Sequence, residues 1–413
     1  MPLPPPARFR LELLTDTFAV LLAASLPWST SATGVFAVLW LLTFLTICDF
    51  AGIRRVIAQP AGGLPLLLIA LGAAGMFWAE VAWAERFNGF GSYLKLAFIP
   101  LLLCHFSRSE RAHCVVIGFL ASCTAMLILS WAMFSWPDML LPFRGKGLGI
   151  PVKDYIAQGG MFSICAFIVA RFAWEFWRAG SRTLAIGFAL LAVAFLADIF
   201  YIATSRTSLV VIVVLLILFG YRQAGWRGIF GLGLIFLLLI AIAWPTAEYF
   251  RERVGMVFEE IQSYRPDGDP TPAGERMEFW KKSIGFMKEA PIFGHGTGSI
   301  REQFTRAAVG KSGMAAEVSA NPHNQLFAVG IQIGVVGIGL LMAMWLAHLM
   351  LFQSASVAAW IGLLITVQNI IGSMFNSHLF DFTHGWAYVV GVGIAGGAVL
   401  KQTAAARRTD STA

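Results

Sequence analysis

His323 is the side chain in this sequence best suited to proton transfer. Asn321 and Pro322 precede it, and this pair predicts a helix start with Asn321 as the N-cap and Pro322 at the first helical position. His323 would then lie in the first turn, where the helix dipole disfavours the imidazolium form. A neutral imidazole can accept a proton from a hydroxyl group. The alternative is a hydrogen-bonded histidine with no chemical role.

Two arginines have the chemistry to bind phosphate groups. Arg206 stands at the end of an apolar run, and Arg276 stands in a long polar segment, four residues before Trp280. A guanidinium group is planar, keeps its charge at physiological pH and binds phosphate oxygens in pairs. For Arg206 the alternative is a side chain that extends from the apolar region to the interface. Asp198 is a candidate partner for Arg206 or for another helix.

Two turns in the polar segment have a possible ligand role and a plain structural one. Residues 294–298, with sequence GHGTG, predict a tight turn that either cradles a phosphate through backbone amides or only folds the chain back. Asp267-Gly268-Asp269 has the form of a metal-binding pair of carboxylates. The neighbouring Gly and Pro fit an ordinary turn equally well, and two arginines can replace the charge of an ion, so we expect no metal and no other cofactor.

Two further groups carry weaker signals. Gly310-Lys311-Ser312 lacks the upstream glycine of a nucleotide-binding loop, because position 305 is Thr305, and we expect no nucleotide. His378, Asp381 and His384 gather near one expected outer turn and could line the same cavity as His323. A zinc site would need a tighter set of ligands.

The elements that must position these residues are expected to be membrane-spanning helices. The chain has 413 residues, of which 58% are hydrophobic and 13% charged, whereas soluble domains carry about 25% charged residues. This composition excludes soluble, disordered and fibrous proteins. The net charge of +7 does not indicate a nucleic-acid partner, because the basic residues fall in short clusters between apolar runs.

Apolar runs long enough to cross a bilayer recur along almost the whole chain, and we count twelve. With the N-terminus inside, the short inner connections and the two ends hold fourteen of the 30 basic residues, as the positive-inside rule requires. Both termini are therefore expected in the cytoplasm. The expected spans are 11–27, 31–49, 64–80, 92–107, 113–136, 156–177, 183–203, 207–221, 227–245, 324–352, 356–376 and 384–400.

These spans divide the chain into three parts: residues 1–245 with nine spans, an outer loop over 246–322, and residues 323–413 with three spans and a short tail. Within the loop we expect a helix over 248–264 and a second helix that starts at Thr271-Pro272. Its apolar residues Met277, Trp280, Ile284 and Met287 recur on one face, which fits either the headgroup region or packing onto the spans. All five cysteines lie in spans or at their inner ends, so we expect no disulfide in the loop.

Three separated elements of this sequence resemble the O-antigen ligase family of bacterial glycosyltransferases. His323-Asn324, followed after nine residues by Gly334 and then Gly337, matches the family pattern His-[Asn/Ser/Gln]-x9-Gly-x-x-Gly, although Ile338 stands where the family often has Thr. The Ser-Arg-Thr around Arg206 is similar to an arginine element at the outer end of a middle span. The stretch from Arg276 through residues 291–296 is similar to the family's Arg-x3-Trp helix and its Pro-x-x-Gly-x-Gly turn.

The resemblance implies an all-α, GT-C-like membrane enzyme with one large periplasmic loop in the bacterial inner membrane. Such enzymes transfer a glycan from undecaprenyl pyrophosphate to an acceptor hydroxyl, here a sugar of lipid A-core. His323 would be the general base, Arg206 and Arg276 would bind the pyrophosphate, and Asn324 would orient the imidazole or a substrate hydroxyl. Arg265, beside Tyr264, would contact the glycan or a phosphate. Attack opposite the leaving group implies inversion at the anomeric carbon.

Other readings stay open at this point. A polymerase or a protein O-oligosaccharyltransferase of the same superfamily would differ in its acceptor. The short remaining outer loops favour a ligase over a polymerase, and the short tail after the last span favours it over a protein-glycosylating member. A transporter would need ionisable residues accessible from both sides of the membrane, whereas the candidates here gather on the outer side. A scaffold that binds the lipid-linked glycan without reacting is the third alternative.

Overall fold

The protein is built from helices, and its computed structural model describes residues 5–412 except 139–144, 146, 249–250, 253–254, 257–259, 261, 263, 266–267 and 269. No strand occurs among the described residues. The first helices are α1 (Pro5–Ser25), α2 (Thr30–Ile47), α3 (Phe50–Ile57), α4 (Pro60–Gly75), α5 (Trp83–Leu94), η1 (Lys95–Ala97), α6 (Phe98–Phe106), α7 (Ala112–Ser135), α8 (Tyr155–Arg178) and α9 (Arg182–Tyr201). They are followed by α10 (Arg206–Thr246), α12 (Pro272–Glu289), α13 (Ile300–Ala308), η2 (Gly313–Ala316), α14 (Gln325–Leu351), α15 (Val357–Ser373) and α16 (Phe382–Thr412).

The prediction of an all-α, multi-pass membrane protein is confirmed. Eight helices in the described part of the chain are long and apolar enough to cross a membrane, and the pair α3 and α4, bent by 83°, would add a ninth. The expected number was twelve. The difference has three sources. α1 carries Arg8, Arg10, Glu12 and Asp16, α15 has only 17 residues, and α10 joins two helical segments across a kink into a single element of 41 residues. The number of crossings therefore stays a prediction.

The long helix α10 is interrupted where the sequence predicts an inner turn. Ala224 and Gly225 have non-helical backbone angles, and φ of Gly225 is 59°. Gly220 and Gly228 approach so closely that neither has room for a side chain. Phe236, beyond the break, packs against Phe200 at the end of α9 with ring centroids 6.1 Å apart. The segment thus has two arms, 206–223 and 226–246, which correspond to two of the expected spans.

Small residues allow the helices of the bundle to pack closely. Gly393, Gly396 and Gly397 of α16 face leucine and phenylalanine side chains of α6, and a Cβ atom at any of them would overlap those neighbours. Helix association in membranes depends on such close contact, because lipid offers no hydrophobic advantage to packing. The core also buries large aromatic side chains, among them Trp40, Tyr93, Phe162 and Trp360.

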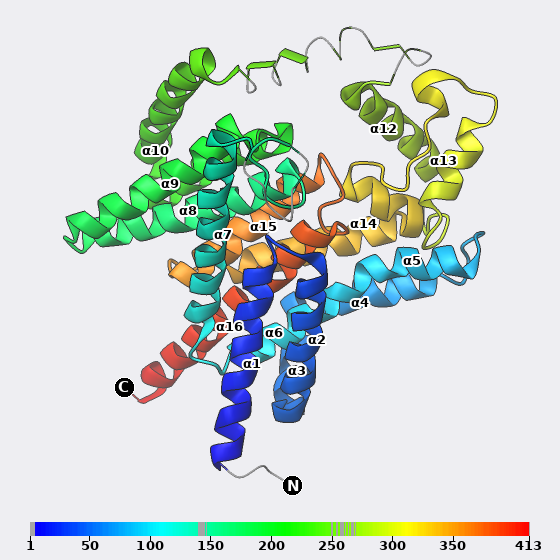
Figure 1. Cartoon of the computed structure of the whole chain (residues 1–413). Coiled ribbons are helices and arrows are strands. Elements are labelled where there is room, and N and C mark those ends of the chain that lie inside the picture. Colours follow the sequence, from blue (N-terminus) through cyan, green and yellow to red (C-terminus); the bar gives the residue numbers. More distant parts are fainter. Residues whose placement is uncertain are drawn as a thin grey trace.

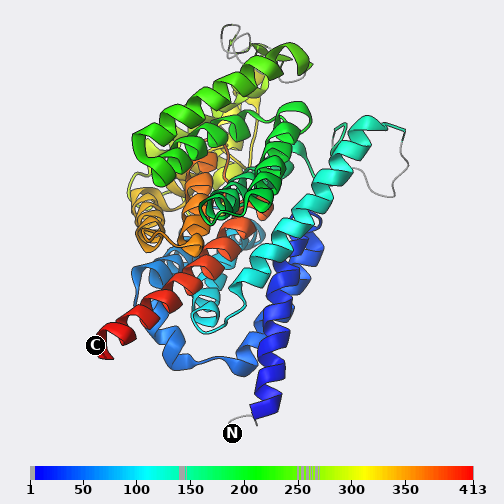
Figure 2. The same cartoon turned by 90° about the vertical axis from the view of Figure 1, so that its left-hand side faces the viewer.

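The two termini lie at one end of the bundle, and α12 and α13 lie at the other (Figure 1). Figure 2 shows both termini in the lower half of the view, with the C-terminus above and to one side of the N-terminus. Which end faces the cytoplasm is not fixed by the fold and stays a prediction from the positive-inside rule.

The outer loop contains α12, α13 and η2, and α12 begins as predicted. Thr271 accepts a hydrogen bond from the N–H of Gly274, and Pro272 is the first helical residue. The apolar residues that were expected on one face are divided: Met277 and Ile284 are exposed, whereas Trp280 lies against Phe327 of α14. The buried face of α12 is instead formed by Phe279, Ser283 and Phe286. The expected helix over 248–264 falls partly, and the pair Asp267 and Asp269 entirely, outside the described residues.

Candidate active site

His323 lies immediately before α14 rather than inside its first turn. Asn324, not Asn321, is the N-cap: its Oδ1 accepts hydrogen bonds from the N–H groups of Leu326 and Phe327. The predicted start was therefore three residues too early, because Pro322 was taken for the first helical residue. Asn321 instead accepts the N–H of His323 and closes a turn. This leaves the imidazole outside the helix, still close to its N-terminus.

The backbone of His323 is in the left-handed region, with φ of 53°. A non-glycine residue in this conformation costs on the order of 1–3 kcal/mol and persists only where its surroundings hold it. Here the imidazole stacks on Phe279 of α12, with centroids 6.0 Å apart and an interplanar angle of 14°. Nδ1 lies 3.2 Å from Oδ1 of Asn376, in the connection between α15 and α16. Two separate segments, α12 and the connection between α15 and α16, therefore contact the ring.

Arg276, on the same helix as Phe279, acts electrostatically on His323. Burial and the positive charge of Arg276 both lower the pKa of His323, and the hydrogen bond with Asn376 opposes them in part. Both effects favour the neutral imidazole, which is the form that a general base requires. The pKa of Arg276 is itself lowered, first by burial and then by the charge of Arg206. In the described part of the chain its guanidinium has no hydrogen-bond partner and no ion pair.

Arg206 begins α10 and forms a bidentate pair with Glu260 of the outer loop. Its Nη1 and Nη2 lie 3.1 and 2.9 Å from the two carboxylate oxygens. Glu260 also accepts the N–H of Ala273 at the start of α12, and the hydrogen bond from Arg206 is the main cause of the lowered pKa of its carboxyl group. One carboxylate thus ties the outer loop to the membrane bundle, in the geometry that a phosphate group would take.

The alternative partner for Arg206, Asp198, lies elsewhere. Asp198 is fully buried in α9, where it accepts hydrogen bonds from Ser130 of α7 at 2.6 Å and Gln158 of α8 at 2.8 Å. It links three helices, so the second possibility, a partner on another helix, is the correct one. A buried carboxylate held by two donors is satisfied locally.

The two expected substrate-binding residues differ in their surroundings. Asn324 uses its oxygen for the helix cap, and its Nδ2 donates to the carbonyl of Met374 at 3.1 Å. Arg265 is exposed, and its backbone carbonyl accepts the N–H of Gly268. The neighbouring Tyr264 donates to Glu278 of α12 at 2.8 Å. Burial, followed by the carboxylate of Glu278, raises the pKa of Tyr264 to about 12.

The glycine-rich turn 294–298 folds the chain back and does not offer its amides to a phosphate. The N–H groups of His295 and Gly296 donate to the carbonyls of Ile331 and Gln332 in α14, each at 2.8 Å. Those carbonyls are available because Ile333 and Gly334 interrupt the helix with non-helical angles. The N–H of Val335 in turn donates to the carbonyl of Pro291. The turn and the helix break therefore complete each other's hydrogen bonds.

His378, Asp381 and His384 do come together, in and just after the connection that carries Asn376. His384 and Asp381 share a hydrogen bond of 2.9 Å, and the rings of His378 and His384 stack with centroids 3.9 Å apart. Lys153 lies near them: its Nζ donates to Thr383 at 3.1 Å, and burial lowers the pKa of this amine to about 8 despite the nearby charge of Asp381. Among the described residues no group of three or more His, Cys, Asp or Glu side chains is arranged to hold a metal ion.

Glu260, Asn376 and Lys153 were not predicted as site residues. None lies in a recognisable motif, and Glu260 and Asn376 enter the site from loops whose position depends on the whole fold. Lys153 has one usable signal, a basic residue in a short outer connection, where the positive-inside rule disfavours it.

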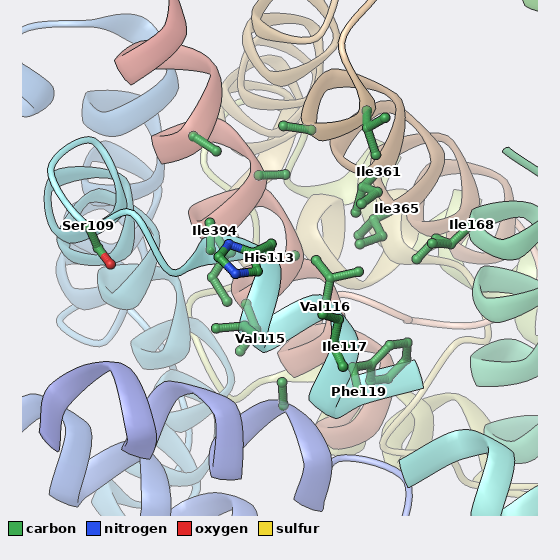
Figure 3. Close-up of a pocket in the computed structure, with 18 of the residues that line it drawn as sticks. Ser109, His113, Val115, Val116, Ile117, Phe119, Ile168, Ile361, Ile365 and Ile394 are labelled. Carbon is green, nitrogen blue, oxygen red and sulfur yellow. The ribbon is translucent and has the colours of Figure 1, made fainter. Parts of the chain in front are cut away.

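A separate cavity of about 520 Å³ lies between α7 on one side and α8, α15 and α16 on the other (Figure 3). Apolar residues such as Val116, Phe119, Ile168 and Ile365 line most of it. None of the predicted site residues contributes to its wall. Its lining suits hydrocarbon rather than phosphate or sugar.

Comparison with known proteins bears on the same part of the chain. A search of curated proteins found no match to this chain. The model of the family described as O-antigen ligase matches residues 191–342. This segment runs from α9 into α14 and includes Arg206, Arg276 and His323. Residues 191–342 therefore carry the domain of the O-antigen ligase family, whose members are membrane glycosyl-transferring enzymes.

Proposed function

We propose that this protein is an O-antigen ligase that transfers a polysaccharide from undecaprenyl pyrophosphate to a sugar hydroxyl of lipid A-core. It would act in the bacterial inner membrane, with both termini in the cytoplasm and the site around His323 facing the periplasm. The observation that carries this proposal is the convergence of Arg206, Arg276 and His323. They come from α10, α12 and the start of α14, and each is an electrostatic or packing neighbour of the next.

The arginines account for the donor. Arg206 and Arg276 repel each other, and only Arg206 has a bidentate carboxylate partner in the described chain. A pyrophosphate group would neutralise this excess charge and accept bidentate hydrogen bonds. As the glycosidic bond breaks, the bonding electrons pass to the pyrophosphate oxygen, and fixed positive charge stabilises the negative charge that develops there. No metal ion is required in this scheme.

His323 accounts for the acceptor. Its neutral imidazole takes the proton from the acceptor hydroxyl while that oxygen attacks the anomeric carbon, opposite the pyrophosphate, so the configuration inverts. General-base assistance of this kind is typically worth about 10²- to 10⁴-fold in rate. We propose that Asn324 contributes by fixing the start of α14 beside the acceptor. Arg265, exposed next to Tyr264, would contact the glycan or a phosphate of the donor.

The test is transfer from undecaprenyl-pyrophosphate-linked glycan to lipid A-core by the purified full-length protein, with EDTA present. We expect His323→Ala to reduce transfer by about 10²- to 10⁴-fold while donor binding is retained. His113→Ala, the same change at an exposed position of α7, is the matched control and should transfer normally.

Three results would contradict parts of this proposal. Extension of the donor glycan without transfer to lipid A-core would identify a polymerase, and transfer to a protein acceptor would identify an O-oligosaccharyltransferase. Full activity of His323→Ala would show that His323 is not the general base. Absence of any reaction in the folded wild type would favour a transporter or a binding scaffold.

A further inference from the structure

We propose that Asn376 is a positioning residue that holds His323 in a single tautomer, with the proton on Nδ1 and the lone pair on Nε2. The catalytic meaning of this inference rests on the proposed function. The tautomer itself is a property of the folded protein and can be measured without any substrate. Asn376 lies between α15 and α16, 53 residues after His323 and outside the segment matched by the family model.

The assignment starts at a backbone amide, which can only donate. The N–H of His323 donates to Oδ1 of Asn321 at 2.9 Å, and the hydroxyl of Ser377 donates to the same oxygen at 2.7 Å. The carboxamide of Asn321 is therefore oriented with its oxygen toward the backbone. Its other end, Nδ2, points at Asn376 and donates to Oδ1 of that residue at 2.8 Å.

The next contact is with the imidazole. Because Asn321 presents an N–H group, Asn376 must present its oxygen to that side, and this oxygen also lies 3.2 Å from Nδ1 of His323. A carboxamide oxygen accepts hydrogen bonds and cannot donate them, so Nδ1 must carry the proton. In a neutral imidazole the lone pair is then on Nε2. One fixed backbone donor thus determines the protonation of the ring through two asparagines.

An asparagine at position 376 suits a neutral base better than a carboxylate would. The group that lowers the pKa of His323, besides burial, is Arg276 of α12, and Asn376 is the hydrogen-bond partner that raises it. Two other neighbours of His323 in the described part of the chain, Asn321 and Phe279, are uncharged. An aspartate at this position would keep an oxygen that accepts the hydrogen bond from Nδ1, but its charge would stabilise the imidazolium form. A smaller fraction of the protein would then have a free lone pair on Nε2 at a given pH.

The connection that contains Asn376 is hydrogen-bonded to the start of α14. The carbonyl of Met374 accepts Nδ2 of Asn324, and Oε1 of Gln325 accepts the N–H groups of Leu379 and Phe380. These contacts hold Asn376 beside His323 and balance the unfavourable left-handed backbone of the histidine. The side-chain oxygen of Asn376 is therefore positioned to accept the hydrogen bond from Nδ1 of His323 before substrate binds.

The first measurement is the tautomer of His323 in the ligand-free, full-length protein, by nitrogen NMR of histidine-labelled samples with His323→Gln to assign the signal. We expect a neutral ring protonated on Nδ1 in the wild type and a mixture or the opposite tautomer in Asn376→Leu. Asn88→Leu, the same change at an exposed position of α5, is the control and should leave the signal unchanged. A wild-type ring protonated on Nε2 would overturn the proposal.

The second measurement is the rate of glycan transfer against pH. We expect Asn376→Leu to lower kcat by about 10- to 100-fold, part of what a general base supplies, with little change in KM. Asn376→Asp should recover most of kcat at high pH while its acid limb moves to higher pH, because the carboxylate raises the pKa of His323.

The outcomes separate the two proposals. Equal loss in Asn376→Leu and Asn376→Asp at every pH would indicate a merely structural role and overturn positioning. A wild type that shows the Nδ1–H tautomer but transfers no glycan would overturn the proposed function and leave the assignment intact. Unfolding of Asn376→Leu in detergent would leave the Asp variant and the wild-type tautomer as the deciding tests.

Discussion

At the scale of single residues, the protonation state of His323 depends on neighbours that are far away in sequence. Burial against Phe279 and the charge of Arg276 lower its pKa, and both of those residues are on α12. A base that is already neutral near pH 7 needs no deprotonation before it can act. The arginine that is proposed to bind the donor would therefore also favour the neutral form of the proposed base.

Removing the charge of Arg276 should raise the pKa of His323. Arg276→Met keeps most of the side-chain volume and removes the repulsion that disfavours imidazolium, so protonation should occur at higher pH than in the wild type. The measurement is a pH titration of the His323 signal by NMR in ligand-free protein. Lys281→Met, on the exposed side of the same helix, should leave the titration unchanged. An unchanged pKa of His323 in Arg276→Met would contradict the claim that the charge of Arg276 lowers this pKa.

The residues of the site were predictable in part. His323, Arg206 and Arg276 each lie in a segment with a recognisable pattern, and the fold brings all three together; their chemical roles remain predictions. Asn376 had no such signal, because an asparagine in a turn is ordinary and only the packed fold places it beside His323. The helix start was wrong for a related reason: Asn321 and Asn324 can both cap a helix, and the structure selects the one whose side chain accepts two amides.

At the scale of elements, two sequence patterns turn out to be one structural unit. The Pro-x-x-Gly-x-Gly turn over 291–296 supplies donors and acceptors to the break in α14 at Ile333 and Gly334. An interrupted helix inside a membrane protein must have its freed backbone groups satisfied by other parts of the chain. This explains why the two patterns occur together, which their separate positions in the sequence did not reveal.

Gly334→Ala should therefore destabilise the protein. Gly334 has φ of 63°, and a Cβ atom there would overlap the carbonyl of Ile292. The backbone conformation alone costs on the order of 1–3 kcal/mol for a residue other than glycine, so we expect a clearly lower melting temperature in detergent. Gly339→Ala is the matched control on the same helix, because a Cβ atom there has open space around it. An equal melting temperature for both variants would contradict the interlocked arrangement.

At the scale of the whole molecule, the charge pattern and the fold both bear on where the two termini lie relative to the outer loop. The positive-inside rule predicts that both termini share a side opposite the long loop, and the structure places both termini at one end and α12 and α13 at the other. The side of the membrane on which each terminus lies stays a prediction. The number of crossings was less predictable, because α3 and α4 form a bent pair and α10 has two arms.

The assignment of compartments can be tested by labelling cysteines from outside the cell. In a Cys48→Ser, Cys114→Ser background, where the remaining three cysteines are buried, we expect Lys311→Cys in the outer loop to react with a membrane-impermeant maleimide in intact spheroplasts. Arg407→Cys near the end of α16 should react only after permeabilisation. Both positions are exposed in the fold, so a difference in labelling reports the side of the membrane. Labelling of Arg407→Cys from outside would reverse the topology and would place His323 away from a periplasmic acceptor.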